Sequence, residues 1–353
     1  MRLTFKELKD EIAKIVPKSI EYKVDLEAGN IAIVTPVPEK FGGGEGLVGK
    51  IAKKVKRKIK IRPDPSIVKP ELEARSIIES IIPEEADISQ IYFDGCFSEV
   101  IIQCQNPGEA VGRRGANVNE IRNKTGWIPK VERTPPIFSK SVHDVRSYRN
   151  SIADERKKLL KDFGLNIHRP KRPSSTWVRV TALGSYREVG RACHLVTTNE
   201  SRVMIDVGVN IASDTDPMPY FTAPEALPLE KLDAVVLTHS HLDHAGMLPV
   251  LFKYGYRGPV YCTPPTRDLM LLLQTDYIKV GGAEGKRPAY DMEDIRTCMK
   301  HVVDVDWGET TDITPDVKLT FSNAGHILGS SAVHLHVADG KHNIVFSGDQ
   351  KYE

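Results

Sequence analysis

In the first part of the chain, apolar residues recur every three to four residues in some segments and every second residue in others. The first spacing predicts helices and the second predicts strands. Thr4 to Glu7 has the form of a capping box, so a helix is expected to begin there and to end before Pro17. The pattern then predicts strands at 19–26 and 30–36, a glycine-rich turn at 41–46, a lysine-rich helix at 47–59 and an edge strand at 59–62. Residues 1–69 are therefore expected to form one small α/β unit.

The same order of elements recurs directly afterwards. The pattern predicts a helix at 71–82, strands at 90–93 and 99–104, a short helix from 107, a second helix at 116–125 and a strand at 128–132. Gly112 lies 69 residues after Gly43, and each begins a Gly-X-X-Gly segment. The chain thus contains a tandem repeat, with its second copy in residues 70–143.

The order helix, strand, strand, helix, Gly-X-X-Gly, helix, strand resembles a type II KH domain. In the second copy two glycines let main-chain amides approach a phosphate at a helix N-terminus, and two arginines between them add positive charge. The resemblance implies that single-stranded RNA is bound by Gly112, Arg113, Arg114 and Gly115.

The first copy departs from this pattern. Its segment Gly43-Gly44-Glu45-Gly46 carries a carboxylate, which repels phosphate, and the alternative register from Gly46 to Gly49 has an apolar filling. We expect this copy to be a scaffold or a weaker binder acting through its lysine-rich helix. A merely solvated lysine face is the competing interpretation.

A charged helix at 144–165 and a linker rich in proline and basic residues at 169–175 separate the repeats from the rest of the chain. Residues 144–176 are interpreted as a helical linker, and residues 177–353 as a third domain. In that domain the pattern predicts strands at 178–184, 189–196, 203–205, 234–237 and 258–262 and a helix at 266–280. This mixture suits two packed sheets with helices outside them.

The length, composition and net charge of the chain limit the classes of protein to which it can belong. With 353 residues and 40% hydrophobic content the chain can fill several ordinary cores, and a net charge of +2 does not by itself indicate a nucleic-acid binder. Five dispersed cysteines favour a reducing compartment over a disulfide framework. No apolar run approaches the roughly 20 residues that cross a bilayer. A cytoplasmic protein without membrane contact is expected.

The densest chemistry lies in the segment 238–246. His239, His241, Asp243 and His244 directly follow a β-branched apolar run, so they are expected at the C-terminal end of a buried strand. Alternation along an extended backbone would place the first three on one side, and a turn into a helix at 245–247 would bring His244 beside Asp243. Imidazole and carboxylate groups at this density indicate a metal site.

The segment His-Ser-His-Leu-Asp-His-Ala-Gly resembles the second motif of the metallo-β-lactamase superfamily. Asp206 matches its first motif, residues 323–330 its third and residues 346–349 its fourth. The resemblance implies an αββα sandwich and two Zn²⁺ ions, with Asp206, Asp243 and Asp349 as catalytic residues and these metal ligands: His239, His241, Asp243, His244, His326 and Asp349. His334 and His336 alternate with apolar residues and are expected on the solvent face of a strand instead.

Residues 188–191 and the glycines around His326 are similar to the β-CASP branch, which cleaves nucleic acids, although Ala192 stands where that branch has serine. Tandem KH units ahead of such a domain resemble the archaeal homologues of the endonuclease subunit of the cleavage and polyadenylation specificity factor. The resemblance implies a zinc-dependent ribonuclease that forms RNA 3′ ends in transcription termination. It implies RNA polymerase as a partner and leaves open an additional 5′–3′ exonuclease activity.

The family places the β-CASP insertion, two further histidines and a homodimer contact after the fourth motif, whereas this sequence ends at Glu353. We therefore expect a sandwich truncated before the insertion, which holds its first zinc more tightly than its second and is inactive alone. An RNA-binding module with a structural or inactive metal domain is the main alternative. A small-molecule hydrolase is a third, which the KH repeat disfavours.

Overall fold

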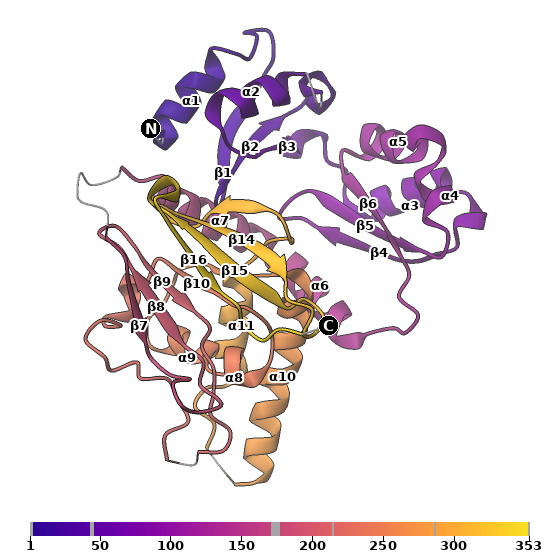
Figure 1. The fold of residues 1–353 in the computed structure, drawn as a ribbon. Helices are drawn as coiled ribbons and strands as arrows, with labels where there is room; N and C mark the ends of the chain where they lie inside the picture. The colour runs from indigo at the N-terminus through magenta and orange to yellow at the C-terminus, as the bar shows by residue number, and fades with distance from the viewer. Residues whose placement is uncertain (1–2, 43–45, 171–176, 214, 286, 352–353) are drawn as a thin grey trace. The chain divides into compact units, whose positions relative to one another are not determined.

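The computed structural model describes residues 3–42, 46–170, 177–213, 215–285 and 287–351, and these form two compact units, Met1–Lys161 and Asp162–Glu353 (Figure 1). Residues Gly43 to Glu45 of the first Gly-X-X-Gly segment and most of the expected linker at 169–175 lie outside the described residues. In the described chain, no helix is long and apolar enough to span a bilayer.

The first repeat begins with the predicted capping box. The Thr4 side chain accepts a hydrogen bond from the Glu7 main chain, and the Glu7 carboxylate accepts one from the Thr4 N–H. The first helix packs one face on a three-stranded sheet. Leu8 and Ile12 of the helix and Ile31 of the sheet are part of the buried core between them. The elements are α1 (Phe5–Ala13), β1 (Lys23–Glu27), β2 (Asn30–Thr35), η1 (Pro38–Phe41), α2 (Leu47–Val55) and β3 (Ile59–Pro63).

The second repeat has the same topology, which confirms the predicted duplication. In each repeat the first two strands pair antiparallel, and the third pairs parallel with the second: β1-β2-β3 and β4-β5-β6. The elements are α3 (Glu71–Ile81), β4 (Ile88–Asp94), β5 (Glu99–Cys104), α4 (Pro107–Val111), η4 (Arg113–Gly115), α5 (Ala116–Thr125) and β6 (Ile128–Arg133).

The charged region after the repeats forms two helices, α6 (Lys140–Ser151) and α7 (Ala153–Ile167), where the sequence pattern predicted one. The break falls at Ile152, whose φ of −111° and ψ of 23° leave the helical region. Helix α6 packs against β4 and belongs to the N-terminal unit, whereas the boundary between the two units falls within α7, after Lys161.

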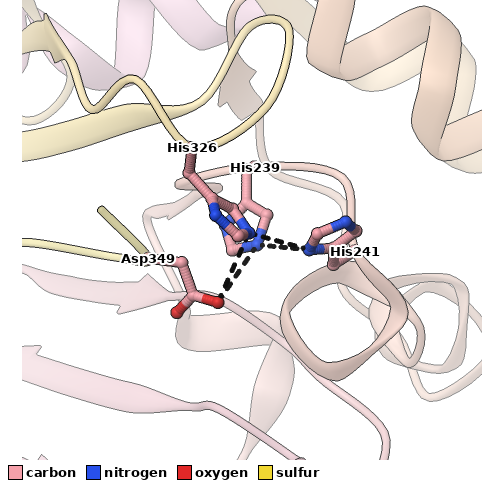
Figure 2. Close-up of side chains that lie close together, drawn as sticks. All are labelled: His239, His241, His326 and Asp349. Atoms are coloured by element: carbon pink, nitrogen blue, oxygen red, sulfur yellow. Dashed lines mark hydrogen bonds and ion pairs between the residues drawn. The ribbon is translucent and has the colours of Figure 1, made fainter. Parts of the chain in front are cut away.

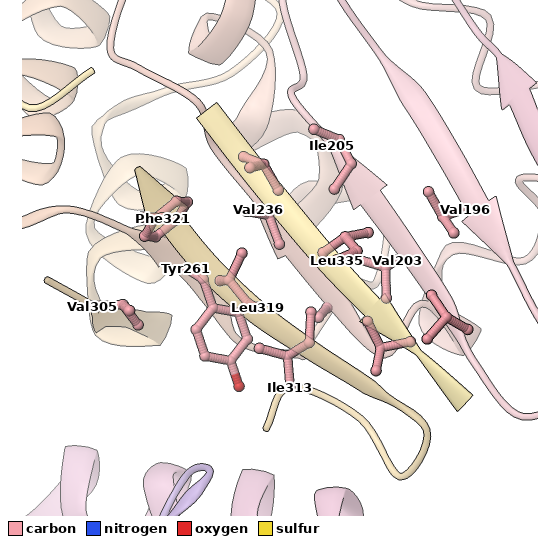
Figure 3. Packing of buried hydrophobic residues seen from close by; sticks show 14 residues of the cluster. Val196, Val203, Ile205, Val236, Tyr261, Val305, Ile313, Leu319, Phe321 and Leu335 are labelled. Atoms are coloured by element: carbon pink, nitrogen blue, oxygen red, sulfur yellow. The ribbon is translucent and has the colours of Figure 1, made fainter. Parts of the chain in front are cut away.

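The second unit contains a six-stranded sheet, β12-β11-β10-β9-β8-β7, and a four-stranded antiparallel sheet, β13-β14-β15-β16. Their facing apolar side chains, among them Val236, Phe321 and Leu335, form the core shown in Figure 3. The first sheet comprises β7 (Arg179–Ala182), β8 (His194–Thr197), β9 (Arg202–Ile205), β10 (Ala234–Val236), β11 (Val260–Cys262) and β12 (Val302–Asp304). The second comprises β13 (Thr310–Asp312), β14 (Val317–Asn323), β15 (Ser331–Val337) and β16 (His342–Phe346).

Helices pack beside these sheets: α9 and α10 both pack against α11, and α10 also packs against β12. They are α8 (Leu242–Ala245), α9 (Leu248–Lys253), α10 (Pro264–Ala283) and α11 (Met292–His301). The two sheets and this helical layer give the mixed α/β domain that the pattern predicted, with its sheets packed face to face.

Candidate metal centre

The segment with the densest chemistry leaves the carboxyl end of β10. This strand is fully buried and pairs parallel with β9 on one side and β11 on the other, as its continuous apolar run predicted. His239 follows three residues later and is completely buried. Because the loop starts from the middle of a sheet, its first imidazole is held in a fixed position.

The helix after the loop begins earlier than the sequence pattern suggested. His241 is the N-cap of α8, and Ala245 N–H donates to its carbonyl oxygen, so Asp243 already lies in the first helical turn. The prediction that Asp243 continues an extended backbone with His239 and His241 was therefore wrong. The turn nevertheless brings Asp243 to 3.8 Å from His244, measured from carboxylate Oδ2 to Nε2.

Four side chains from three separate segments converge beside this loop (Figure 2). Their ligand atoms all lie within 4.8 Å of one another, and they belong to His239, His241, His326 and Asp349. Nδ1 of His241 is 3.1 Å from Nε2 of His239 and 3.2 Å from Nε2 of His326. Oδ2 of Asp349 is 3.5 Å from Nε2 of His326.

The four-residue group fits a zinc ion. Zn–N bonds of about 2.0–2.1 Å in a tetrahedron separate neighbouring nitrogens by about 3.3 Å, close to the two spacings found. Burial, followed by the charge of nearby His244, lowers the pKa of His239 to about 4, so its imidazole is neutral, as a metal ligand must be. Thr238 Oγ1 lies 3.0 Å from Nδ1 of His239 and orients that ring.

Hydrogen bonds hold the loop that carries His326, and the segment after Asp349 is tied to it by the Lys351 N–H, which donates to the Ala324 carbonyl at 3.1 Å. The main-chain N–H groups of His326 and Ile327 both donate to Ser330 Oγ. The hydroxyl of Thr263 donates to the Gly329 carbonyl at 2.7 Å, which anchors the same loop to the start of α10. These supporting hydroxyls were missed in the sequence, where only their places beside the motifs could have marked them.

Asp206 is buried and holds the other side of the site. Its carboxylate accepts from the Thr238 N–H and the Thr238 hydroxyl, each at 2.8 Å, and lies 2.8 Å from Nδ1 of His244. Burial alone would lower the pKa of His244, but the charge and hydrogen bond of Asp206 outweigh it and raise the pKa to about 9. Surroundings that favour a proton there also favour a metal cation in its place.

Asp243, His244 and Asp349 form a looser second group around the same loop. Oδ1 of Asp349 is 3.4 Å from Nε2 of His244, while its Oδ2 faces the histidine group described above. Asp349 therefore lies between the two groups, where one carboxylate can bridge two ions. Within the described residues only the four-residue group has all its ligand atoms within 4.8 Å.

The other sequence candidates lie elsewhere. His334 and His336 point away from the buried face of β15, because Val333, Leu335 and Val337 alternate with them and are buried, as predicted. In the N-terminal unit, Gly112 and Gly115 have φ of +74° and +78° and flank the exposed Arg113 and Arg114. That loop therefore has the left-handed backbone that glycines accept, with two outward-facing guanidinium groups.

Two family matches and several relatives fit this architecture. Residues 195–350 match the metallo-beta-lactamase superfamily domain, and residues 2–68 match the KH domain of transcription termination factor FttA. Proteins named transcription termination factor FttA are 49% identical in Methanosarcina mazei and 43% in Pyrococcus abyssi, each over 98% of this chain and 55% of the relative. The relative of that name from Lokiarchaeum is 39% identical over 99% of this chain and 55% of its own length.

The chain thus spans about half the length of the curated relatives it matches. Among solved structures, a metallo-beta-lactamase from Cronobacter sakazakii aligns with 47% of this chain and 60% of its own, at 19% identity and a TM-score of 0.34. That alignment is too partial to support a functional argument.

Proposed function

This chain is a homologue of the proteins named transcription termination factor FttA, and from that premise we propose that it binds nascent RNA and contributes a zinc centre for RNA cleavage in termination. The observation that carries the proposal is the convergence of three imidazoles and one carboxylate within 4.8 Å. A protein that terminates transcription works on RNA at the polymerase, so RNA polymerase is the proposed partner.

The four-residue group would hold the first zinc, and Asp243, His244 and Asp349 would contribute to a second. Two bound zinc ions would supply an activated water and neutralise charge on the attacked and leaving oxygens of a phosphodiester. Asp206 keeps His244 oriented through Nδ1, which leaves Nε2 directed at Asp243 and Asp349. Asp349 connects the two groups of ligands, so its loss would disturb both.

The loop at Gly112 to Gly115 is the proposed RNA contact. Its arginines are exposed, and α5 begins at the residue after Gly115, so two cations lie beside the N-terminus of a helix. The Asn117 side chain donates to the Glu109 carbonyl at 3.0 Å and ties α5 to the preceding helix. This arrangement suits the phosphates of an unpaired strand.

Cleavage of a labelled RNA tests the catalytic part of the proposal. The natural full-length protein should cut it in the presence of zinc, and Asp243→Ala and His244→Ala should each lower the rate at least 100-fold. His334→Ala is the matched control, since this histidine lies outside the site and should leave the rate unchanged. RNA binding without cleavage would instead support the alternative of an RNA-binding module whose metal domain is structural.

The RNA contact is tested separately by Arg113→Asp and Arg114→Asp together. Reversing two charges should weaken binding of single-stranded RNA at least tenfold and flatten its salt dependence. Unchanged affinity at two salt concentrations would refute the assignment of this loop.

A further inference from the structure

A groove lies between the two repeats of the N-terminal unit, and the proposed RNA loop does not account for it. It consists of two neighbouring hollows of about 320 and 690 Å³, which share Pro38 and Glu39 of the first repeat and Arg122 and Gly126 of the second. Volumes of this size match ligand-binding clefts. Because both repeats supply walls, neither repeat alone would form this groove.

The repeats are packed firmly enough to define the groove. Arg62 of β3 pairs with Glu27 of its own repeat and with Glu99 of the other repeat, with N–O distances of 2.6 and 2.8 Å. The indole N–H of Trp127 donates to the Lys69 carbonyl at 2.9 Å. These buried polar contacts fix the spacing of the walls.

One wall of the groove is the free edge of β3. Ile31 N–H donates to the Lys58 carbonyl and Asp64 N–H donates to the Thr35 carbonyl, so alternate main-chain groups of β3 face β2. By that alternation the N–H and C=O of Ile61 face away from β2, at the edge of the sheet, and Ile61 is one of the residues that line the groove. An outward-facing donor and acceptor side by side suit the hydrogen-bonding edge of a nucleobase.

The side chains of the groove match a nucleotide better than an apolar ligand. Pro38, Val48 and Ile61 are half-buried and provide an apolar surface on which a base can lie. Arg122 is exposed and makes no ion pair with another described residue, so its guanidinium is available to a phosphate. The exposed Glu39 carboxylate repels phosphate and can accept from the amino group of a base.

Helix α5 connects this groove to the arginine loop. A Cβ built on Gly115 would lie 3.8 Å from the Asn119 amide nitrogen, and Asn119 and Arg122 line the larger hollow. Residues 115, 119, 122 and 126 are spaced by three or four and share one helical face. From Gly115 to Arg122 this face extends about 10 Å at 1.5 Å per residue.

We propose that single-stranded RNA continues from the loop Gly112 to Gly115 along this face of α5 into the groove between the repeats. One base lies there on Pro38, Val48 and Ile61, and Arg122 of the second repeat holds its phosphate. The first repeat thus takes part in binding through a composite groove, without needing an arginine loop of its own. This inference rests on the proposed RNA contact of the second repeat.

RNA length separates the groove from the loop, since a KH loop clamps about four nucleotides. Fluorescence anisotropy should show that the protein binds a single-stranded RNA of about eight nucleotides at least about fivefold more tightly than one of four, as expected for one added stacked base. Arg122→Ala should abolish most of this gain and leave the affinity for the four-nucleotide RNA unchanged. Lys124→Ala is the control, because Lys124 lies on the same helix, pairs with Glu120 and does not line the groove.

If the Arg122→Ala and unsubstituted proteins bound the longer RNA with equal affinity, the proposal that the groove binds RNA would be refuted. If the charge reversal at Arg113 and Arg114 still weakened binding in that case, the proposed RNA loop would stand without the groove. If none of these variants bound RNA more weakly than the unsubstituted protein, both the groove and the RNA loop would be refuted. Circular dichroism of each variant confirms that the exposed substitutions leave the fold intact.

Discussion

Replacing Arg62 by alanine should destabilise the N-terminal unit more than any exposed charge substitution in it. The Arg62 side chain is only 10% exposed and donates to both carboxylate oxygens of Glu27, at 2.6 and 2.8 Å, and to Glu99 at 2.8 Å. Its guanidinium also lies 4.8 Å from the ring centre of Phe97. The alanine variant leaves two nearly buried carboxylates without this cation.

Removing one partner of a buried ion pair typically costs about 3–5 kcal/mol. We expect a cost at the lower end of this range, because Glu99 would keep one cationic partner. That partner is the solvent-exposed Lys130, whose ammonium group lies 2.6 Å from the Glu99 carboxylate. A loss of about 3 kcal/mol corresponds to a roughly 100-fold larger unfolded population. For comparison, Lys124→Ala removes an exposed pair with Glu120 and should cost no more than about 0.5 kcal/mol.

Hydrogen exchange with mass spectrometry can measure this loss in peptides from residues 1–161 separately from the metal domain. Burial alone would raise the pKa of Glu99, but Arg62 and Lys130 outweigh it and hold the pKa below its ordinary value of 4.5. The stability from Glu99 is therefore present above that value and disappears as the pH falls through the lowered pKa. The difference between the Arg62→Ala and unsubstituted proteins should accordingly be largest near neutral pH and smaller in acid.

Adding Glu27→Gln to the Arg62→Ala protein should recover part of the lost stability, because it removes one of the uncompensated charges. A cost below about 1 kcal/mol for Arg62→Ala, or the same cost at every pH, would refute the reasoning. Apolar packing alone would then hold the two repeats together.

Three further predictions concern the metal centre and the junction of the repeats. Elemental analysis after dialysis should find zinc in the protein, with a sharp loss in His239→Ala and none in His334→Ala; equal zinc in both would exclude the four-residue group. Asp206→Asn should lower the pKa of His244 from about 9 toward 6.5 in NMR titrations of the metal-free protein, since Asp206 is the main group that raises it. Gly126→Ala should lower the melting temperature more than Gly285→Ala: both have left-handed φ, but only at Gly126 would the Cβ collide with the Ile67 carbonyl; equal losses would show that only the backbone strain matters.

The sequence by itself determined the repeats and the position of the histidine-rich loop. The capping box at Thr4, the alternation in β15 and the continuous apolar run of β10 are local patterns, and each follows from how a helix or strand buries one face or both. The resemblance of four motifs to a known family predicted a set of metal ligands, and four of these residues, His239, His241, His326 and Asp349, have ligand atoms within 4.8 Å of one another in the structure.

The local sequence pattern predicted the wrong boundaries where a helical turn begins or ends within a few residues. Asp243 was placed on an extended backbone, but the hydrogen bonds from Ala245 and Gly246 to His241 and Leu242 close a helical turn at once. In the same way the single helix expected after the repeats divides at Ile152, where the main chain leaves the helical region. Such boundaries depend on a few hydrogen bonds that residue periodicity does not encode.

Only the tertiary structure decided how distant segments meet. Asp349 follows the last described strand, and its approach to His239 and His244 depends on how the second sheet packs on the first. Likewise, Arg122 and Pro38 share a groove because Arg62 and Gly126 join two repeats that the sequence presents as separate units. Contacts between segments far apart in the chain are set by the packing of whole sheets and repeats, and no local pattern of residues contains that information.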